Sequence, residues 1–247
     1  MTTEKEIIKK GKVIVVLPAY NAAATLERTV SEIPRNIVDE IILVDDGSQD
    51  ETAAIAQKLG LVTYRHQSNR GYGANQKTCY TLALARGGEI VVMLHPDYQY
   101  NPRLIKFLVG FIEEGYFDVM LGSRIRTRKE ALAGGMPLYK YLANRFLTII
   151  ENLVSGYNLS EWHTGMRAYR RVVLEKIDFQ KNSDDFVFDT QTLFKIIENG
   201  FSIGEIPVAV RYFPEASSTN FIQSVRYGLA TLGEAFKHLI KRGRRKC

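Results

Sequence analysis

Residues 40–52 read EIILVDDGSQDET, a short apolar run that ends at two aspartates followed by glycine and serine. A run of this kind, without polar alternation, is typical of a strand buried on both faces of a sheet. Residues 12–17, KVIVVL, form a second such run, which ends at PAYN. Helix-like segments follow at residues 22–33 and 50–59. Strand and helix alternating in this way predict a parallel sheet covered by helices.

The same alternation continues along the chain. Further strands are expected at residues 61–64, 89–94, 118–121, 166–169 and 202–210. Further helices are expected at residues 74–85, 102–114, 137–154, 190–198 and 219–240. The sequence therefore predicts the α/β class, with a mainly parallel, Rossmann-like sheet, helices on both faces and a C-terminal amphipathic helix.

The composition is that of a globular protein. Of the 247 residues, 45% are hydrophobic and 24% are charged, which suits a packed core. The two cysteines, Cys79 and Cys247, fit neither a disulfide framework nor a zinc finger, and they suit a reducing compartment. The charged N-terminus is unlike a signal peptide, and no apolar run reaches the roughly 18 residues that span a bilayer. We therefore expect a cytoplasmic protein.

Four of the expected strands end in a polar cluster. The clusters are PAYN (18–21), DDGS (45–48), HQSNRGYG (66–73) and HPDYQ (95–99). Each cluster alone would fit an ordinary turn, in which Gly, Asn and Asp are common. The C-terminal ends of parallel strands, however, lie along one edge of the sheet, where α/β proteins bind ligands. The four clusters together predict one binding crevice.

The last cluster places His95, Asp97 and Gln99 at every second position. In an extended chain these three side chains point to one side. Asp97 and Gln99 offer the oxygen ligands that Mg²⁺ or Mn²⁺ prefers. Asn101, directly before Pro102, is better placed than Asp97 to cap the next helix. Because no glycine-rich phosphate motif is present, we expect a divalent metal that bridges these groups to a diphosphate.

Seven short motifs, in this order, resemble glycosyltransferase family 2, whose fold is called GT-A. They are VIVVLPAYN (13–21), EIILVDDGSQDET (40–52), NRGYGAN (69–75), HPDYQYNP (95–102), GSR (122–124), TGMRAYRR (164–171) and EIPV (205–208). The likeness covers roughly residues 12–215. Within the family, the sequence is similar to the dolichyl- and polyprenyl-phosphate sugar synthases.

The resemblance implies transfer of a hexose from a GDP- or UDP-linked donor, with Mg²⁺ or Mn²⁺ as the cofactor. Asp97 and Gln99, with His95 as a third ligand, would bind this metal on the donor diphosphate, and Asp97 would serve catalysis through it. The other donor-binding residues that the resemblance implies are Pro18, Tyr20, Asn21, Asp45, Asp46, Gly47 and Arg70.

In the synthase subgroup the acceptor is a lipid phosphate, and Arg124 matches the arginine that receives it. A downstream Arg/Ser pair of the subgroup aligns best with Lys140 and Asn144, which lie four residues apart on one helical face. Lysine is still a phosphate partner, although it lacks the bidentate fork of arginine. A phosphate acceptor is already anionic near neutral pH, so its attack needs no strong base.

Transfer to a sugar hydroxyl of a glycan or glycolipid is the alternative, and it requires a carboxylate to take the proton. Glu161 is the leading candidate for this catalytic base, because the family often has Asp at that place. Asp184, Asp185 and Asp189 are further candidates, although the first two also fit a solvated loop.

Two departures from the family pattern remove negative charge from the donor site. His95 stands where the subgroup usually has the first Asp of D-x-D-x-Q, and Ala22 stands where it usually has Glu. His95 would be a neutral metal ligand, a hydrogen-bond donor to the donor phosphate, or a spectator packed against the sheet. A noncatalytic homologue that binds nucleotide sugars is therefore a further alternative.

The chain ends in a predicted amphipathic helix and a basic tail. Residues 237–247 carry six basic residues and no acidic one, which equals the whole net charge of +6. We expect residues 1–218 to form the GT-A domain. Residues 219–247 would belong to that domain or anchor it peripherally at the cytoplasmic face of a membrane, unless the tail is simply a frayed end.

Two other classes of protein are disfavoured. The sequence pI of 9.2 would suit a nucleic-acid binder, but the basic residues concentrate in the tail and no RNA-reading aromatic motif is present. We therefore expect no nucleic-acid partner. A sugar nucleotidyltransferase would need a glycine-rich loop with Arg and Lys directly after the first strand, where this chain has PAYN.

Overall fold

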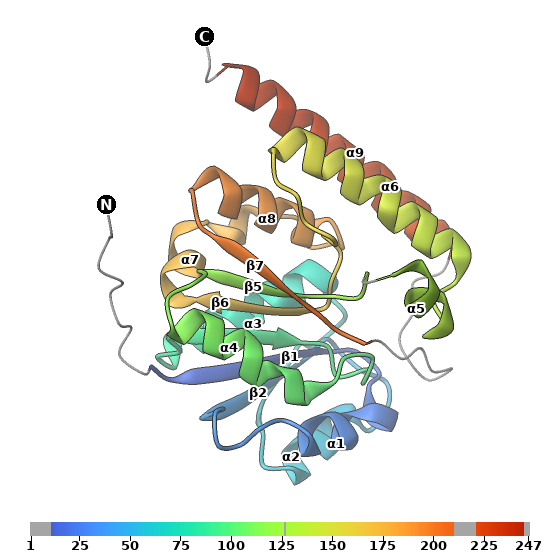
Figure 1. The fold of residues 1–247 in the computed structure, drawn as a ribbon. Helices are drawn as coiled ribbons and strands as arrows, with labels where there is room; N and C mark the ends of the chain where they lie inside the picture. Colours follow the sequence, from blue (N-terminus) through green and yellow to red (C-terminus); the bar gives the residue numbers. More distant parts are fainter. Residues whose placement is uncertain (1–10, 126, 210–220, 245–247) are drawn as a thin grey trace.

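A seven-stranded sheet forms the centre of the protein (Figure 1). The computed structural model describes residues 11–125, 127–209 and 221–244, and the sheet has the order β3-β2-β1-β4-β6-β5-β7. The strands are β1 (Val13–Ala19), β2 (Glu40–Asp45), β3 (Val62–Arg65), β4 (Ile90–Leu94), β5 (Val119–Ser123), β6 (Met166–Arg170) and β7 (Ile203–Pro207).

The sheet is mainly parallel, as the sequence predicted. Strand β6 is the exception, because it pairs antiparallel with both of its neighbours, β4 and β5. Leu94, at the C-terminal end of β4, therefore lies opposite Met166, at the start of β6. The loop that precedes β6 consequently reaches the same sheet edge as the loops that follow β1, β2 and β4.

Helices cover both faces of the sheet. The side chains of β1 alternate between the two layers: Val13, Val15 and Leu17 pack toward α1, α2 and α4, while Ile14 and Val16 pack toward α3, α7 and α8. These helices are α1 (Ala23–Ser31), α2 (Thr52–Lys58), α3 (Tyr72–Ala85), α4 (Ile105–Glu113), α7 (Arg171–Lys176) and α8 (Phe188–Glu198).

Several boundaries differ from those expected. The helix predicted at 102–114 consists of a 3₁₀ turn, Pro102–Leu104, followed by α4, and Asn101 caps the turn by accepting a hydrogen bond of 3.0 Å from the Arg103 amide. The helices α5 (Arg128–Ala133) and α7, and the turn Phe179–Lys181, were not predicted. They are too short for a helical period to show in the sequence.

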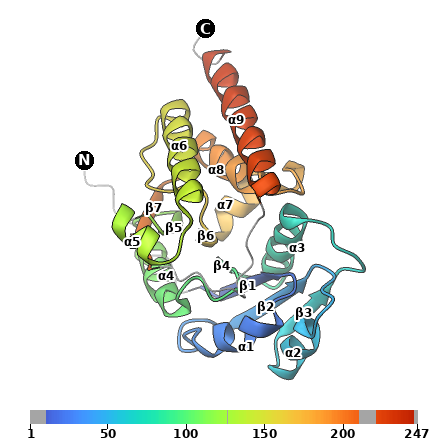
Figure 2. The same ribbon diagram turned by 90° about the vertical axis from the view of Figure 1, so that its right-hand side faces the viewer.

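Two long helices, α6 (Leu138–Ser155) and α9 (Phe221–Arg244), lie side by side and extend away from the sheet (Figures 1 and 2). In both helices, several buried side chains are polar and several exposed side chains are apolar, the reverse of the usual arrangement. The buried side chains of α6 include Asn144, Thr148, Glu151 and Ser155, while its exposed side chains include Leu138, Leu142, Phe146, Ile149 and Leu153. Helix α9 likewise buries Thr231 and His238 and exposes Val225, Leu229, Phe236, Leu239 and Ile240. The exposed face of α6 is thus mainly apolar, and that of α9 combines these apolar side chains with Arg226, Lys237 and Lys241.

The amphipathic C-terminal helix is therefore present. Two of the six basic tail residues have described side chains, and both form ion pairs: Lys237 with Glu234 at 2.8 Å, and Lys241 with Glu198. The other four side chains, and the division expected at residue 218, lie outside the described residues, so the domain division stays a prediction. Among the described residues, no helix combines the length and hydropathy that crossing a bilayer requires.

Gly73 offers a test of the packing between α3 and the loop before α8. A Cβ atom at this position would clash with the Ser183 carbonyl oxygen and stand 2.9 Å from the Asp184 carbonyl carbon. We expect Gly73→Ala to lower the free energy of unfolding by about 1–3 kcal/mol, because backbone atoms would have to move. Urea unfolding measures this change.

Gly110→Ala is the matched control, because Gly110 lies inside α4 and no atom lies within 4 Å of its added Cβ. There the gain in helix propensity should leave the stability unchanged or raise it by up to about 1 kcal/mol. Equal unfolding midpoints for the two variants would contradict the packing described for Gly73.

Candidate active site

A cavity of about 710 Å³ opens at the C-terminal edge of the parallel strands. All four polar clusters contribute to its wall, together with residues of α6 and α9. The predicted site residues that line it are Pro18, Tyr20, Asn21, Asp46, His95, Asp97, Gln99, Arg124, Lys140 and Asn144. The predicted site residues that do not line it are Asp45, Gly47, Arg70 and Glu161.

The two aspartates at the C-terminal end of β2 are buried and hold loops in place. Asp46 accepts hydrogen bonds from the Arg70 amide at 2.9 Å and the Gly71 amide at 3.0 Å, and it contacts His66 Nδ1 at 2.6 Å. Asp45 accepts from the Ser48 amide at 3.1 Å and from its hydroxyl. Asp46 therefore fixes the start of the α3 segment, while Asp45 closes its own turn behind the cavity.

The PAYN and DDGS loops are tied to each other. The Asn21 amide donates to Ser48 Oγ at 2.8 Å, and Asn21 Oδ1 accepts from the Gln49 amide at 2.8 Å. Gly47 has a φ of +75°, and a Cβ there would come within 2.9 Å of the Asn69 amide nitrogen. Gly47 thus allows the loops after β2 and β3 to meet. It shapes these loops and does not itself line the cavity.

Asp97 is the carboxylate that best suits a metal. Burial raises its pKa, and Asp97 Oδ1 accepts a hydrogen bond of 3.0 Å from the Gln99 amide. Within the described residues, no Lys or Arg forms an ion pair with Asp97. Nor do these residues contain a group of three or more His, Cys, Asp or Glu side chains that could hold a metal ion. One carboxylate, one amide and one imidazole still fit Mg²⁺ or Mn²⁺, because these ions take several ligands from water and substrate phosphates.

His95 lies in the same wall. Its backbone amide donates to the Gly165 carbonyl at 3.3 Å, and its ring stacks on Tyr72 with a centroid distance of 5.4 Å. Burial lowers the pKa of His95, which favours the neutral ring. His95 is therefore held by groups from α3 and from the loop before β6, two segments that are far apart in the sequence.

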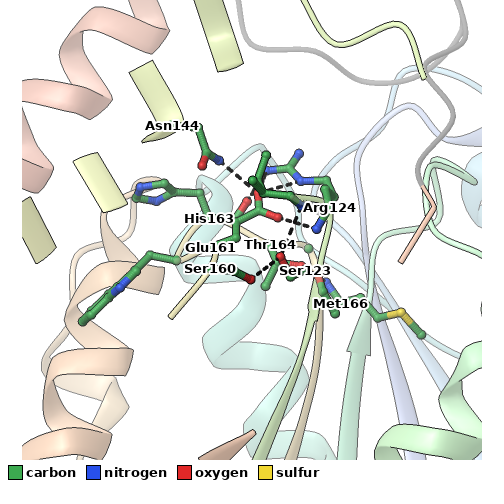
Figure 3. Close-up of polar contacts among 12 residues, drawn as sticks. Ser123, Arg124, Asn144, Ser160, Glu161, His163, Thr164 and Met166 are labelled. Carbon is green, nitrogen blue, oxygen red and sulfur yellow. Dashed lines mark hydrogen bonds and ion pairs between the residues drawn. The ribbon is translucent and has the colours of Figure 1, made fainter. Parts of the chain in front are cut away.

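A second set of polar contacts is centred on Glu161 and Arg124 (Figure 3). The Glu161 side chain is fully buried; its Oε2 accepts from the Arg124 amide at 2.6 Å and its Oε1 accepts from Arg124 Nε at 2.7 Å. Asn144 Nδ2 also donates to Oε1, at 3.0 Å, and Arg124 Nη2 also donates to the His163 carbonyl. Glu161 thus orients two of the predicted acceptor residues while lying outside the cavity wall.

A second carboxylate, which is half-buried, supports this centre. Glu205 of β7 accepts from the Ser160 amide at 2.8 Å, from Ser160 Oγ at 3.0 Å and from the Glu161 amide at 3.2 Å. Burial raises its pKa. Ser160 Oγ also lies 2.7 Å from Ser123 Oγ (Figure 3). The EIPV and GSR motifs therefore meet at the loop that carries Glu161.

Lys140 lines the cavity near Arg124. Burial, and secondly the neighbouring Arg124 charge, lower the pKa of Lys140. Two cations on one cavity wall disfavour each other, and an anion between them would relieve that repulsion. This arrangement is suited to receiving a phosphate.

Sequence reasoning missed the contribution of α9. Tyr227 lines the cavity, and its hydroxyl lies 2.5 Å from His163 Nδ1, while His163 Nε2 lies 3.1 Å from Glu151 Oε2 of α6. Tyr72 and Arg167 were also missed as partners of Asp189. The residues of these groups are between 12 and 117 positions apart, so no local motif could have shown them.

The other proposed carboxylates are placed differently. Asp184 is exposed and pairs with Lys77 at 2.7 Å, whereas Asp185 lines the cavity. Asp189 also lines it, but its carboxylate is engaged by Tyr72 and Arg167. The role of Glu161 or of any of these residues as a base stays a prediction.

Comparisons with known proteins agree with this architecture. The family model described as Glycosyl transferase family 2 matches residues 14–178. A UDP-N-acetylglucosamine–dolichyl-phosphate N-acetylglucosaminyltransferase from Methanococcus voltae is 27% identical over 227 residues, covering 84% of this chain and 90% of that protein. A polyprenol monophosphomannose synthase from Mycolicibacterium smegmatis is 29% identical over 209 residues, covering 80% of this chain and 76% of that protein.

The fold also matches that of a solved structure. Glucosyl-3-phosphoglycerate synthase from Mycobacterium tuberculosis, in complex with UDP, superposes with a TM-score of 0.71 at 21% identity, covering 91% of this chain and 80% of that one. This likeness confirms the expected GT-A fold, and the two named relatives support the resemblance to the polyprenyl-phosphate sugar synthases. The chain is a glycosyltransferase, and it belongs to glycosyltransferase family 2.

Proposed function

We propose that this glycosyltransferase moves a hexose from a GDP- or UDP-linked donor to a polyprenyl or dolichyl phosphate, with a divalent metal at the donor side. The observation that carries the proposal is that Arg124, Lys140 and Asn144 share one cavity with Asp97 and Gln99. The names of the two relatives, which include dolichyl phosphate and polyprenol monophosphomannose, support the choice of acceptor.

On the donor side, Asp97, Gln99 and His95 would hold the metal, and Tyr20 and Asn21 would contact the nucleotide. Structures of the mycobacterial synthase that contain UDP with Mn²⁺ or with Mg²⁺ support a metal here. A bound divalent ion neutralises the charge that develops on the leaving diphosphate. Asp97 would set the position of the ion, because burial raises its pKa and a bound cation would compensate the charge of its carboxylate.

On the acceptor side, Arg124 and Lys140 would bind the lipid phosphate through charge-assisted hydrogen bonds. A phosphate oxygen then attacks the anomeric carbon, and the nucleoside diphosphate leaves with the electrons of the broken bond. The anionic phosphate needs no base. Glu161 is therefore proposed as a positioning residue: both of its oxygens already accept from Arg124, and it does not line the cavity.

We also propose that the apolar surface of α6 and α9 rests on an anionic membrane. A helix that buries Asn144 and Glu151 while exposing Phe146 and Leu153 is arranged for an apolar medium on its outer side. Lys and Arg of the tail would add roughly 1 kcal/mol each near anionic lipids. Such docking would bring a lipid-linked phosphate to the cavity that the same two helices line.

Asp97→Asn should abolish the metal dependence of donor binding. We expect transfer to fall by about 100-fold or more, because even residues that only support metal ligands are typically worth 10–100-fold. The measurement is the rise in melting temperature caused by UDP or GDP with and without Mn²⁺, together with transfer to polyprenyl phosphate. Asp178→Asn, at an exposed ion pair with Lys181, is the control. Unaltered Mn²⁺ dependence in Asp97→Asn would remove Asp97 from the metal site.

Glu161→Gln and Lys140→Ala should raise the KM for polyprenyl phosphate by about 10–100-fold, since each disturbs a charged partner of that phosphate. Binding of UDP or GDP should be unchanged. Arg171→Lys, which alters a surface pair with Glu175 at 2.7 Å, is the control. The opposite pattern would be a loss of kcat in Glu161→Gln at constant KM, with activity on a sugar hydroxyl. That result would restore Glu161 as the base and overturn the phosphate acceptor.

Membrane attachment is tested by cosedimentation with phosphatidylglycerol vesicles. The double change Leu142→Glu and Phe146→Glu should abolish binding by the intact chain, because it places two charges on the outer face of α6. The matched change, Phe107→Glu with Phe111→Glu, alters two aromatic residues exposed on α4 and should leave binding intact. A chain that ends at Ile240 separates the helices from the tail. Equal binding by all four proteins would refute the proposed face.

A further inference from the structure

A chain of hydrogen bonds runs from His95 in the cavity wall into the core. His95 Nε2 lies 3.1 Å from the Tyr72 hydroxyl, and that hydroxyl donates to Asp189 Oδ2 at 2.8 Å. Asp189 also pairs with Arg167 Nη2 at 3.1 Å and accepts from Gln76 Nε2 at 3.0 Å. The chain thus joins the loop after β4 to α3, α8 and β6.

The order of donors along this chain is fixed by charge. Arg167 is fully buried and can only donate, so Asp189 is the acceptor in this pair, and its Oδ2 also accepts from the Tyr72 hydroxyl. The single hydroxyl proton of Tyr72 therefore goes to Asp189. The Tyr72 oxygen can then only accept from His95, so Nε2 carries a proton, and the lone pair that a metal could use is the one on Nδ1.

The ring of His95 cannot turn over easily. Tyr72 stacks on one side of it and is itself stacked on Phe186 at a centroid distance of 4.8 Å. On another side, a Cβ at Gly165 would overlap His95 Cδ2 and stand 3.1 Å from Nε2. Within the described residues no group bonds to Nδ1, which is on the ring edge away from Cδ2. His95 shares the cavity wall with Asp97 and Gln99.

We propose that Tyr72 and Asp189 are positioning residues that hold His95 in the Nε2–H tautomer and so offer its Nδ1 lone pair to the metal. This inference rests on the proposed donor site. It makes one ligand a neutral nitrogen where the family pattern has a carboxylate. Imidazole nitrogen suits transition-metal ions better than the hard ion Mg²⁺, so the site should prefer Mn²⁺ or Co²⁺ over Mg²⁺ more strongly than a site built from two carboxylates.

The tautomer itself is tested without metal or substrate. Nitrogen-15 NMR of the histidine-labelled full chain should show His95 with a protonated Nε2 and an unprotonated Nδ1. Tyr72→Phe keeps the stacked ring but removes the hydroxyl, and it should shift His95 toward a mixture of tautomers. Tyr157→Phe, which removes a hydroxyl bonded to the Phe201 carbonyl at 3.2 Å, is the matched control and should change nothing. A protonated Nδ1 in the unchanged protein would overturn the proposal.

The metal part is tested by binding of Mn²⁺ and Mg²⁺ in the presence of UDP or GDP, followed by electron paramagnetic resonance and calorimetry. Tyr72→Phe should weaken Mn²⁺ binding by about 10–100-fold, the usual effect of losing a group that orients a ligand. His95→Asp should narrow the preference for Mn²⁺ over Mg²⁺. Unchanged Mn²⁺ affinity in Tyr72→Phe would overturn the positioning role.

The two proposals fail in different ways. If Mn²⁺ binds to the unchanged chain but no lipid phosphate is glycosylated, the proposed acceptor is wrong and the role of His95 stands. If Mn²⁺ binds equally well to the unchanged chain and to His95→Ala, His95 is not a ligand, while the proposed transfer remains. If Mn²⁺ does not bind to the unchanged chain at all, the metal role of His95 is overturned together with the proposed donor site.

Discussion

The side of the cavity proposed to receive the acceptor depends on the ion pair between Glu161 and Arg124. A fully buried carboxylate is stable only when its charge is compensated, and removing one partner of such a pair costs about 3–5 kcal/mol. Here Arg124 follows β5, Glu161 precedes β6, and Asn144 joins them from α6. One interaction therefore fixes the relative position of three segments, and it holds Arg124 at the cavity wall.

The direction of β6 makes this arrangement possible. Had β6 run parallel to β4, the loop carrying Glu161 would end at the far edge of the sheet, away from Asp97. Because Met166 lies opposite Leu94, the loop that carries Asp97 and the loop that carries Glu161 meet at one edge. The parallel half of the sheet provides the proposed donor side, and a single reversed strand adds the proposed acceptor side to it.

Local sequence was sufficient for part of this structure. Apolar runs such as VIVVL and EIILV located buried strands, and the polar residues after them located the cavity. The direction of β6 was not predictable, because a short apolar run does not show whether a strand runs parallel or antiparallel to its neighbours. Asp45 and Gly47 sit in a recognisable motif, yet only the folded loops show that they face away from the cavity. The bond between Tyr72 and Asp189 spans 117 positions and has no local signature.

The inverted polarity of α6 and α9 has a consequence for handling the protein in water. An apolar strip that includes Leu142, Phe146 and Leu153 is a surface on which copies of the chain can associate. Its solution behaviour should vary with concentration and with detergent, since either another copy or a micelle covers the strip. The particle mass measured in solution then depends on protein concentration and on bound detergent as well as on the mass of the chain. Kinetic measurements therefore have to state the detergent or lipid used, together with salt and pH.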